Sequence, residues 1–115
     1  MKIGAYTWTG ASGIKYEMDA YTLDTKFKDG IEGNYIFAKP RDNGGHIDAV
    51  YIGEGKLKDR IEFRINDGCV LRKGADRVCV RVEGDEQTRK AIEDDLLEAN
   101  TCAYAPTGCN IKIGG

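Results

Sequence analysis

Two short segments decide the expected fold: Gly33–Ala38 (GNYIFA) and Ile47–Gly53 (IDAVYIG). Both are rich in aromatic and β-branched residues, a composition typical of strands, and Pro40 ends the first of them. Between them, Asp42–Gly45 (DNGG) consists of residues that favour a tight turn. The two segments therefore predict an antiparallel β-hairpin.

A second hairpin is predicted on the N-terminal side. Ile14–Tyr21 alternates apolar and charged residues, which is the pattern of a half-buried strand. The aromatic segment Ala5–Thr9 precedes it, and Gly10–Gly13 supplies turn residues between the two. We therefore expect residues 5–23 to form a β-hairpin that extends the rest of the fold.

After Gly53 the apolar period changes from two to about 3.6 residues. Leu57, Ile61 and Ile65 stand four residues apart, which predicts an amphipathic helix that ends near Asn66–Gly68. Arg60 and Arg64 are also four residues apart, so they project from one side of this helix, next to the apolar stripe.

The chain then alternates again over Arg77–Glu83, which predicts a further strand. A second helix is expected over Glu86–Ala99, with Asp85 as its N-cap. The expected fold class is therefore α/β (α+β), with a small central antiparallel sheet flanked by helices. We expect a single domain over residues 1–115, composed of the hairpin extension (1–30) and a core (31–113).

Composition limits the class of protein. The chain has 115 residues, of which 41% are hydrophobic, and its net charge is −2, so it can form one hydrophobic core. It has no apolar stretch of about 20 residues, and Met1–Thr9 lacks the apolar region of a signal peptide. We therefore expect a soluble, cytoplasmic protein with no membrane partner.

The net charge hides an uneven distribution. Residues 56–81 contain eight basic and four acidic residues, whereas residues 82–100 contain two basic and seven acidic ones. The acidic total therefore does not exclude a DNA partner. It predicts weak, salt-sensitive binding, because few phosphates could be neutralised at once.

The four cysteines, Cys69, Cys79, Cys102 and Cys109, are widely spaced, and the one histidine, His46, lies far upstream. Zinc sites normally show close cysteine pairs, so this spacing disfavours a zinc site and favours ordinary reduced thiols. A disulfide is expected only in a secreted protein.

The order of several residues across the hairpin and the two helices resembles the signature of the GIY-YIG nuclease family. In that family two short tyrosine-containing motifs are followed by a helical arginine, a helical glutamate, a proline and an asparagine. The resemblance covers residues 33–110 and leaves the N-terminal hairpin outside. The matching positions are Gly33–Tyr35, Tyr51–Gly53, Arg60, Glu93, Pro106 and Asn110.

This resemblance implies a divalent-metal-dependent endonuclease that hydrolyses phosphodiester bonds in DNA. Such hydrolysis needs a metal ion and a cation that holds the phosphate. Glu93 is the expected ligand of Mg²⁺ or Mn²⁺, since magnesium is often held by one carboxylate together with water and substrate oxygens. Arg60, supported by Arg64, is expected to contact the phosphate through its planar guanidinium group.

The remaining site residues are expected to accept the proton of the attacking water or to orient the other groups. Tyr51 is the predicted base, because a nearby cation would favour its phenolate form. Tyr35, on the adjacent strand, and Asn110 are expected to orient the other groups, as the family implies.

Three alternatives stay open. Taken singly, the tyrosines fit core packing, Glu93 fits a solvated acidic helix face, and the arginines fit surface ion pairs. The chain has Arg64 where many family members carry a histidine, which favours a catalytically impaired module that binds nucleic acid or protein. An unrelated α/β domain is the third interpretation. Because no DNA-selecting domain is evident, a partner protein or a homodimer is expected to supply specificity for branched or duplex DNA.

Overall fold

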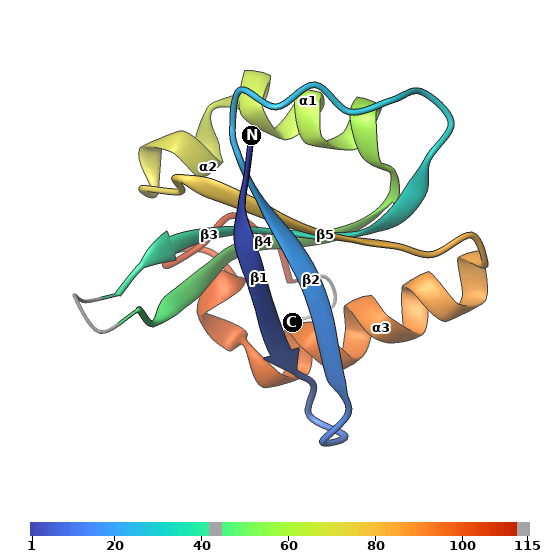
Figure 1. The fold of residues 1–115 in the computed structure, drawn as a ribbon. Helices are drawn as coiled ribbons and strands as arrows, with labels where there is room; N and C mark the ends of the chain where they lie inside the picture. Colours follow the sequence, from blue (N-terminus) through green and yellow to red (C-terminus); the bar gives the residue numbers. More distant parts are fainter. Residues whose placement is uncertain (42–44, 113–115) are drawn as a thin grey trace.

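The computed structural model describes residues 1–41 and 45–112, and it contains one sheet with helices on both faces (Figure 1). The five strands are antiparallel and follow the order β1-β2-β5-β3-β4. This architecture confirms the predicted α+β class. The elements are β1 (Lys2–Thr9), β2 (Lys15–Thr22), β3 (Glu32–Pro40), β4 (Ile47–Lys56), α1 (Leu57–Asp67), α2 (Cys69–Arg72), β5 (Arg77–Val82), α3 (Glu86–Ala99) and a 3₁₀ turn, η1 (Thr101–Ala103).

The predicted hairpin of β3 and β4 is present, and both strands are longer than expected. Its predicted turn includes residues 42–44, which lie outside the described residues, as does residue 113 at the end of the predicted core. The helix α1 ends before Gly68, and the Asp85 carboxylate accepts a hydrogen bond from the Thr88 N–H at 2.9 Å at the start of α3. Both predicted helices are thus confirmed. The short helix α2 was not predicted.

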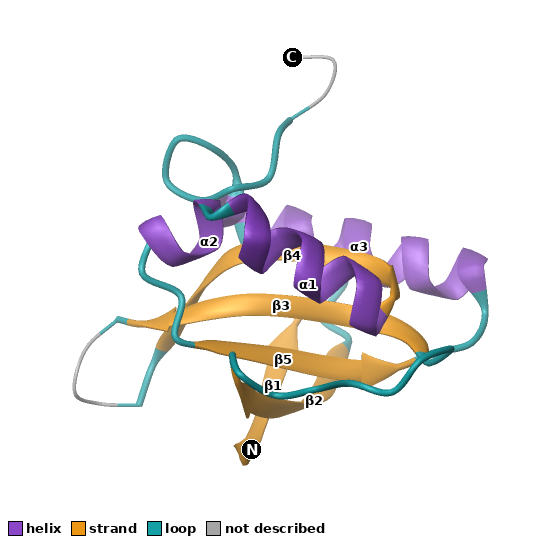
Figure 2. Cartoon of the chain, turned by 90° about the horizontal axis from the view of Figure 1, so that it is seen from above, coloured by secondary structure: helices purple, strands orange, loops and turns teal. Residues whose placement is uncertain are grey.

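The helices divide the core into two layers. Helices α1 and α2 cover one face of the sheet and α3 covers the other (Figures 1 and 2). Alternation along β3 follows this division, because Tyr35 and Phe37 pack on the α1 side, whereas Ile36 and Ala38 pack on the α3 side. Among the described residues, no helix combines the length and apolar character needed to cross a membrane.

A β-bulge in β4 changes which way its side chains face. Phe37 pairs with Tyr51 while the next residue, Ala38, pairs with Ala49, so Val50 is an extra residue. In consequence, Val50 and Tyr51 both pack on the α1 side. Without the bulge, strict alternation would direct one of these two side chains to the α3 face.

Gly53 lies opposite Tyr35 in the β3–β4 pairing. A Cβ at this position would overlap the Tyr35 ring. The glycine that follows Tyr51-Ile52 therefore allows the Tyr35 ring to lie across the neighbouring strand.

The N-terminal hairpin is part of the same sheet. Strand β2 pairs with β5 over four residue pairs, from Asp19 with Val80 to Thr22 with Arg77. Trp8, Tyr16 and Met18 of the hairpin are buried in the α3-side core. The hairpin therefore contributes to the main core.

Asp95 of α3 attaches the turn of this hairpin to the helix. Its carboxylate accepts hydrogen bonds from the Ser12 N–H at 2.8 Å, the Ser12 hydroxyl at 2.6 Å and the Tyr16 hydroxyl at 2.7 Å. Its backbone carbonyl accepts from the Ala11 N–H at 3.1 Å. These hydrogen bonds from Ser12 and Tyr16 lower the pKa of Asp95.

The prediction of four reduced thiols is wrong for two of them, because Cys69 and Cys109 form a disulfide. They are 40 residues apart in the sequence, so spacing rules could not reveal that α2 and the C-terminal segment lie side by side. Cys79, which is buried, and Cys102 are free thiols. Cys79 packs in the α3-side core.

We expect Asp95→Ala to lower the melting temperature, because it removes the acceptor of three hydrogen bonds. The pKa of Asp95 is lowered in the folded state, so its contribution is present above the ordinary carboxyl pKa and is lost as pH falls through the folded value. Thermal unfolding at neutral and acidic pH measures this. Glu98→Ala, an exposed change on the same helix, is the control. A pH-independent difference would contradict the assignment.

We expect Cys69→Ser to reduce the free energy of unfolding by roughly 4 kcal/mol, from the chain entropy of a loop of this length. Urea denaturation without reductant measures the change. Cys102→Ser is the matched control, since Cys102 forms no disulfide. If the wild type and Cys69→Ser had the same midpoint under oxidising conditions, the bond would not contribute to stability.

Candidate functional site

Four of the predicted site residues line one cavity of about 330 Å³. It lies at β4, an edge strand of the sheet, and is bounded by α1, α3 and the C-terminal segment. We call it the Tyr51 cavity. The four residues are Tyr51, Arg64, Glu93 and Asn110.

Tyr35 lies behind this cavity. It is 1% exposed, and its ring stacks on Tyr51 with the centroids 6.0 Å apart and an interplanar angle of 26°. Burial raises the pKa of Tyr35. Tyr35 thus supports the position of the Tyr51 ring, which agrees with an orienting role.

Arg64 also contacts the Tyr51 ring. Its Cζ atom lies 4.1 Å from the centroid of the Tyr51 ring, a cation–π contact. Arg64 follows the buried Ile61 by three residues on α1, so its side chain projects beside the core. Burial raises the pKa of Tyr51, and the Arg64 charge opposes this rise without reversing it. Tyr51 therefore carries its proton at neutral pH in the free protein.

Glu93 approaches the cavity from α3. It is partly buried because it follows Ile92 and precedes Leu96, two core residues of the helix. Loss of solvation raises the pKa of Glu93 to about 7, and the charge of Glu54 adds to the effect. A carboxyl group with a pKa near neutrality can exchange a proton under physiological conditions, which is typical of functional sites.

Asn110 closes the C-terminal side of the cavity. Its side-chain amide donates to the Ile52 carbonyl and accepts from the Ile52 N–H, both at 2.9 Å. These bonds occupy the outward-facing backbone of β4, as a neighbouring strand would. The hydrogen bonds of Asn110 are thus to the backbone, and they hold the C-terminal segment against the sheet.

Arg60 lies one helical turn from Arg64 and does not line the Tyr51 cavity. It extends over Gly55 into a second depression of about 660 Å³, which we call the Arg89 hollow. Its charge still lowers the pKa of Glu93. Arg64, which was predicted to support Arg60, is the arginine that contacts Tyr51.

Arg89 was missed by the sequence analysis. Its side chain is 5% exposed and forms ion pairs with Glu54 at 2.9 Å and Glu32 at 3.2 Å. It also donates to the carbonyls of Glu83 and Gly84. An arginine next to Lys90 on a polar helix has the pattern of a surface residue, so only the tertiary structure reveals its burial.

The side chains that line the Tyr51 cavity can be compared with the ligands that a divalent metal ion needs. Within residues 1–41 and 45–112, no group of three or more histidine, cysteine, aspartate or glutamate side chains could hold one. Glu93 is the one carboxylate among the residues that line the described cavity. Mg²⁺ often binds through a single carboxylate, with water and substrate oxygens as the other ligands. Glu93 therefore fits a hydrated divalent cation that is shared with substrate.

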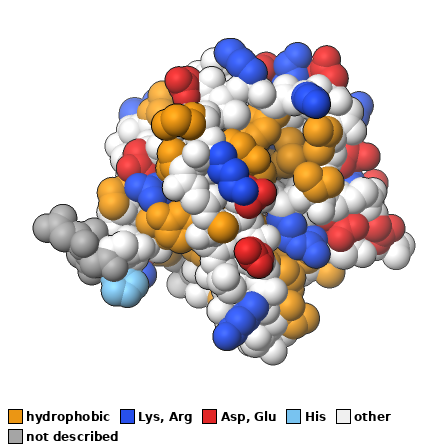
Figure 3. Space-filling view, in the orientation of Figure 1, with side chains coloured by type: hydrophobic (Ala, Val, Ile, Leu, Met, Phe, Trp, Pro, Cys, Tyr) orange, Lys and Arg blue, Asp and Glu red, His pale blue; other side chains and the backbone are white. Residues whose placement is uncertain are grey.

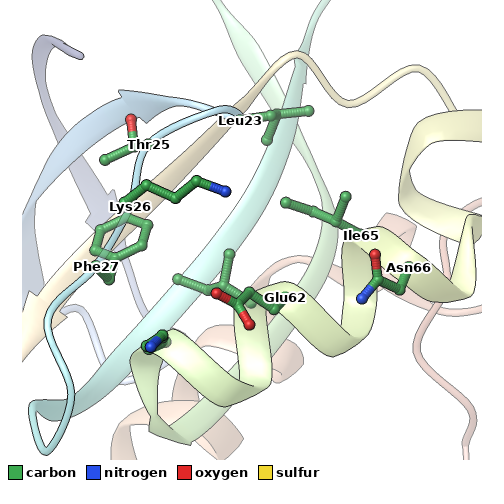
Figure 4. Close-up of a pocket in the computed structure, with 9 residues that line it drawn as sticks. Leu23, Thr25, Lys26, Phe27, Glu62, Ile65 and Asn66 are labelled. Atoms are coloured by element: carbon green, nitrogen blue, oxygen red, sulfur yellow. The ribbon is translucent and has the colours of Figure 1, made fainter.

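A further depression, of about 340 Å³, lies between α1 and the loop that connects β2 to β3 (Figure 4). Leu23 and Phe27 line it from the loop, Ile65 lines it from α1, and Lys26 extends into the gap. It contains none of the predicted site residues.

Comparisons with protein-family models, curated proteins and solved structures gave no match to this chain. The resemblance to GIY-YIG nucleases therefore stays a prediction, and the functional argument rests on the geometry of the site.

The raised pKa of Glu93 predicts a pH-dependent stability. The folded state holds the proton more tightly than the unfolded state, so this contribution is fully present below a pH of about 4.5 and is lost as pH rises through about 7. Glu93→Gln removes the penalty of ionisation. Above this range we expect the variant to be more stable than the wild type by roughly 1 to 3 kcal/mol, and the gain should shrink on acidification.

Urea unfolding across this pH range measures the effect. Glu98→Gln removes an exposed carboxylate from the same helix and serves as the control. Parallel pH profiles for the wild type and Glu93→Gln would show that Glu93 has an ordinary pKa.

Proposed function

We propose that the protein is a divalent-metal-dependent DNA endonuclease of the GIY-YIG type. The observation that carries this proposal is the convergence of a phenol, a guanidinium group and a partly buried carboxylate on one open cavity, from Tyr51, Arg64 and Glu93. Tyr51 and Arg64 come from β4 and α1, which are consecutive in the sequence, and Glu93 comes from α3, much later in the chain. The chemistry of phosphodiester hydrolysis requires such a combination.

Arg64 binds the scissile phosphate in this proposal. Its guanidinium group is planar and permanently charged, and the Tyr51 ring restricts its orientation. Arg60, one turn earlier on α1, supplies a second positive charge to the same face of the helix. In this proposal Arg64 is therefore the main phosphate ligand and Arg60 supports it, whereas the sequence analysis assigned these roles the other way round.

Glu93 is the residue that would hold the divalent cation. The bound cation would neutralise charge on the phosphate and lower the pKa of a coordinated water. Because the pKa of Glu93 is about 7, the proton and the cation compete for the carboxylate near neutrality. Activity is therefore expected to rise as pH increases through this range.

Tyr51 accepts the proton of the attacking water in its phenolate form, after the phenol has released its own proton to solvent. Its pKa is raised by burial, so the phenol is protonated in the free protein, while the stacked Arg64 charge favours the phenolate. Tyr35 keeps the Tyr51 ring in place. This role also predicts activity that increases with pH.

The partners and location follow the same proposal. DNA, branched or duplex, is the substrate class, and a partner protein or homodimer supplies specificity. The cytoplasmic location stays a prediction, and there the Cys69–Cys109 bond would have to persist against cellular thiols.

A catalytically impaired binding module is the second candidate function. The observation that favours it is that Arg64, in place of a histidine, contacts Tyr51 directly. Such a module would bind nucleic acid or protein through the same cavity without hydrolysis.

A Mg²⁺-dependent nicking assay on plain and branched DNA tests the proposal. We expect Glu93→Gln and Arg64→Ala each to lower the cleavage rate by about a hundredfold or more, since each removes a charged group that acts on the phosphate. We expect Tyr51→Phe to lower it by a similar factor, because it removes the proton acceptor.

The matched controls are Glu98→Gln on α3 and Arg72→Ala on α2, which remove exposed charges outside the cavity. Equal cleavage by the wild type and Glu93→Gln would contradict the assigned site. DNA binding without cleavage by the wild type, at any Mg²⁺ or Mn²⁺ concentration, would favour the binding module.

A further inference from the structure

We infer that the Arg89 hollow is a binding site for one unpaired nucleobase, with preference for a base that carries an exocyclic amino group. This inference rests on the proposed function for the identity of the ligand as nucleic acid. Nothing in the sequence pattern pointed to this hollow, because its central residue, Arg89, is buried only in the folded protein.

The hollow adjoins the Tyr51 cavity along both helices. Arg60 lies four residues before Arg64 on α1, and Arg89 lies four residues before Glu93 on α3. Each pair is separated by about one helical turn, or roughly 5.4 Å. A single nucleic-acid strand could therefore place its scissile phosphate in the cavity and the neighbouring nucleotide in the hollow.

The volume suits a flat aromatic ligand. At about 660 Å³ the hollow is within the range of small-molecule sites, and it is open to solvent. Phe63 lies on its α1 side, directly before Arg64 in the sequence, and is 61% exposed. An exposed phenyl ring beside cationic side chains is the usual platform on which unpaired bases stack.

The opposite wall supplies hydrogen-bond acceptors. Arg89 binds one carboxylate oxygen of Glu54 and one of Glu32. Among the described residues, the one hydrogen bond to these two carboxylates is the bond from Arg89 Nε to one oxygen of Glu54, so oxygens of both groups remain able to accept from a ligand. An ionised carboxylate only accepts hydrogen bonds, so the wall matches an amino group on the ligand.

This pattern distinguishes among the bases. Cytosine, adenine and guanine carry exocyclic amino groups, whereas thymine has one ring N–H flanked by two carbonyl oxygens, which would be repelled by the carboxylates. The hollow need not repel the strand, because its four acidic residues are matched by four basic ones. They are Glu32, Glu54, Asp59 and Glu86, with Lys56, Arg60, Arg89 and Lys90. On the face of the molecule seen in Figure 3, basic and acidic side chains are interspersed and form no single large basic patch.

Only an unpaired nucleotide can use such a site, because a base within a duplex is stacked on its neighbours and cannot reach a side hollow. Single-stranded ends or branch points of DNA therefore fit better than continuous duplex. This defines the substrate class of the Tyr51 cavity more narrowly than the site residues alone.

Fluorescence anisotropy with labelled oligodeoxycytidylate and oligothymidylate, without divalent cations, tests the inference. We expect the wild type to prefer the cytidine strand. Phe63→Ala should weaken binding of that strand by about five- to 150-fold, the range found for loss of one base–aromatic stack. Glu32→Gln should reduce the preference between the two strands, since an amide both donates and accepts.

Leu71→Ala, which truncates an exposed apolar side chain on α2, is the matched control. Equal affinity of the wild type for both strands, unchanged binding by Phe63→Ala, or no binding to either strand would each overturn the inference. Because the cations needed for cleavage are absent, this result is separate from the nicking assay. A wild type that cleaves duplex while Phe63→Ala binds normally would keep the proposed function and reject the hollow.

Discussion

The register between β3 and β4, which includes the β-bulge at Val50, is the constraint on which the candidate site depends. It pairs Tyr51 with Phe37, which places Tyr51 on the α1 side of β4, where the ring meets both Tyr35 and Arg64. The same stretch of β4 also holds the C-terminal segment, because the Val50 carbonyl accepts from the Cys109 N–H at 2.8 Å. The pairing of one edge strand therefore directs the tyrosine, and the same stretch of that strand positions a wall of the cavity.

The C-terminal segment protects this edge while leaving the cavity open. An unpaired edge strand exposes backbone groups that can pair with other chains. Here Asn110 satisfies both outward-facing backbone groups of Ile52, and the Cys69–Cys109 disulfide attaches the segment to α2. The edge is thus covered by a short, covalently attached segment, and its side chains form part of the site.

Much of the fold could be predicted from local patterns. The period of Leu57, Ile61 and Ile65 predicted α1, and Asp85 predicted the start of α3, because both signals lie within a few residues of the elements they define. The bulge, the disulfide and the burial of Arg89 could not be predicted, since each depends on segments that meet only in the tertiary structure. The candidate site residues could be chosen from their order in the sequence. Which arginine contacts Tyr51 could not, because that depends on how α1 packs on the sheet, and the structure shows that it is Arg64 rather than Arg60.

The surroundings of Glu93 lower the stability of the folded protein when this carboxylate is ionised. Burial and the nearby Glu54 both disfavour the ionised form of Glu93, while Arg89 balances Glu54 on its other side. A core optimised for stability would place an apolar side chain between Ile92 and Leu96 on this wall. Glu93 stands there instead, and its ionised form is disfavoured by burial and by the Glu54 charge. Binding of a proton or a cation to the Glu93 carboxylate would remove this cost, so it would also stabilise the folded state. Carboxylates with a raised pKa are common at binding sites, where a proton or a cation lowers the cost of burial.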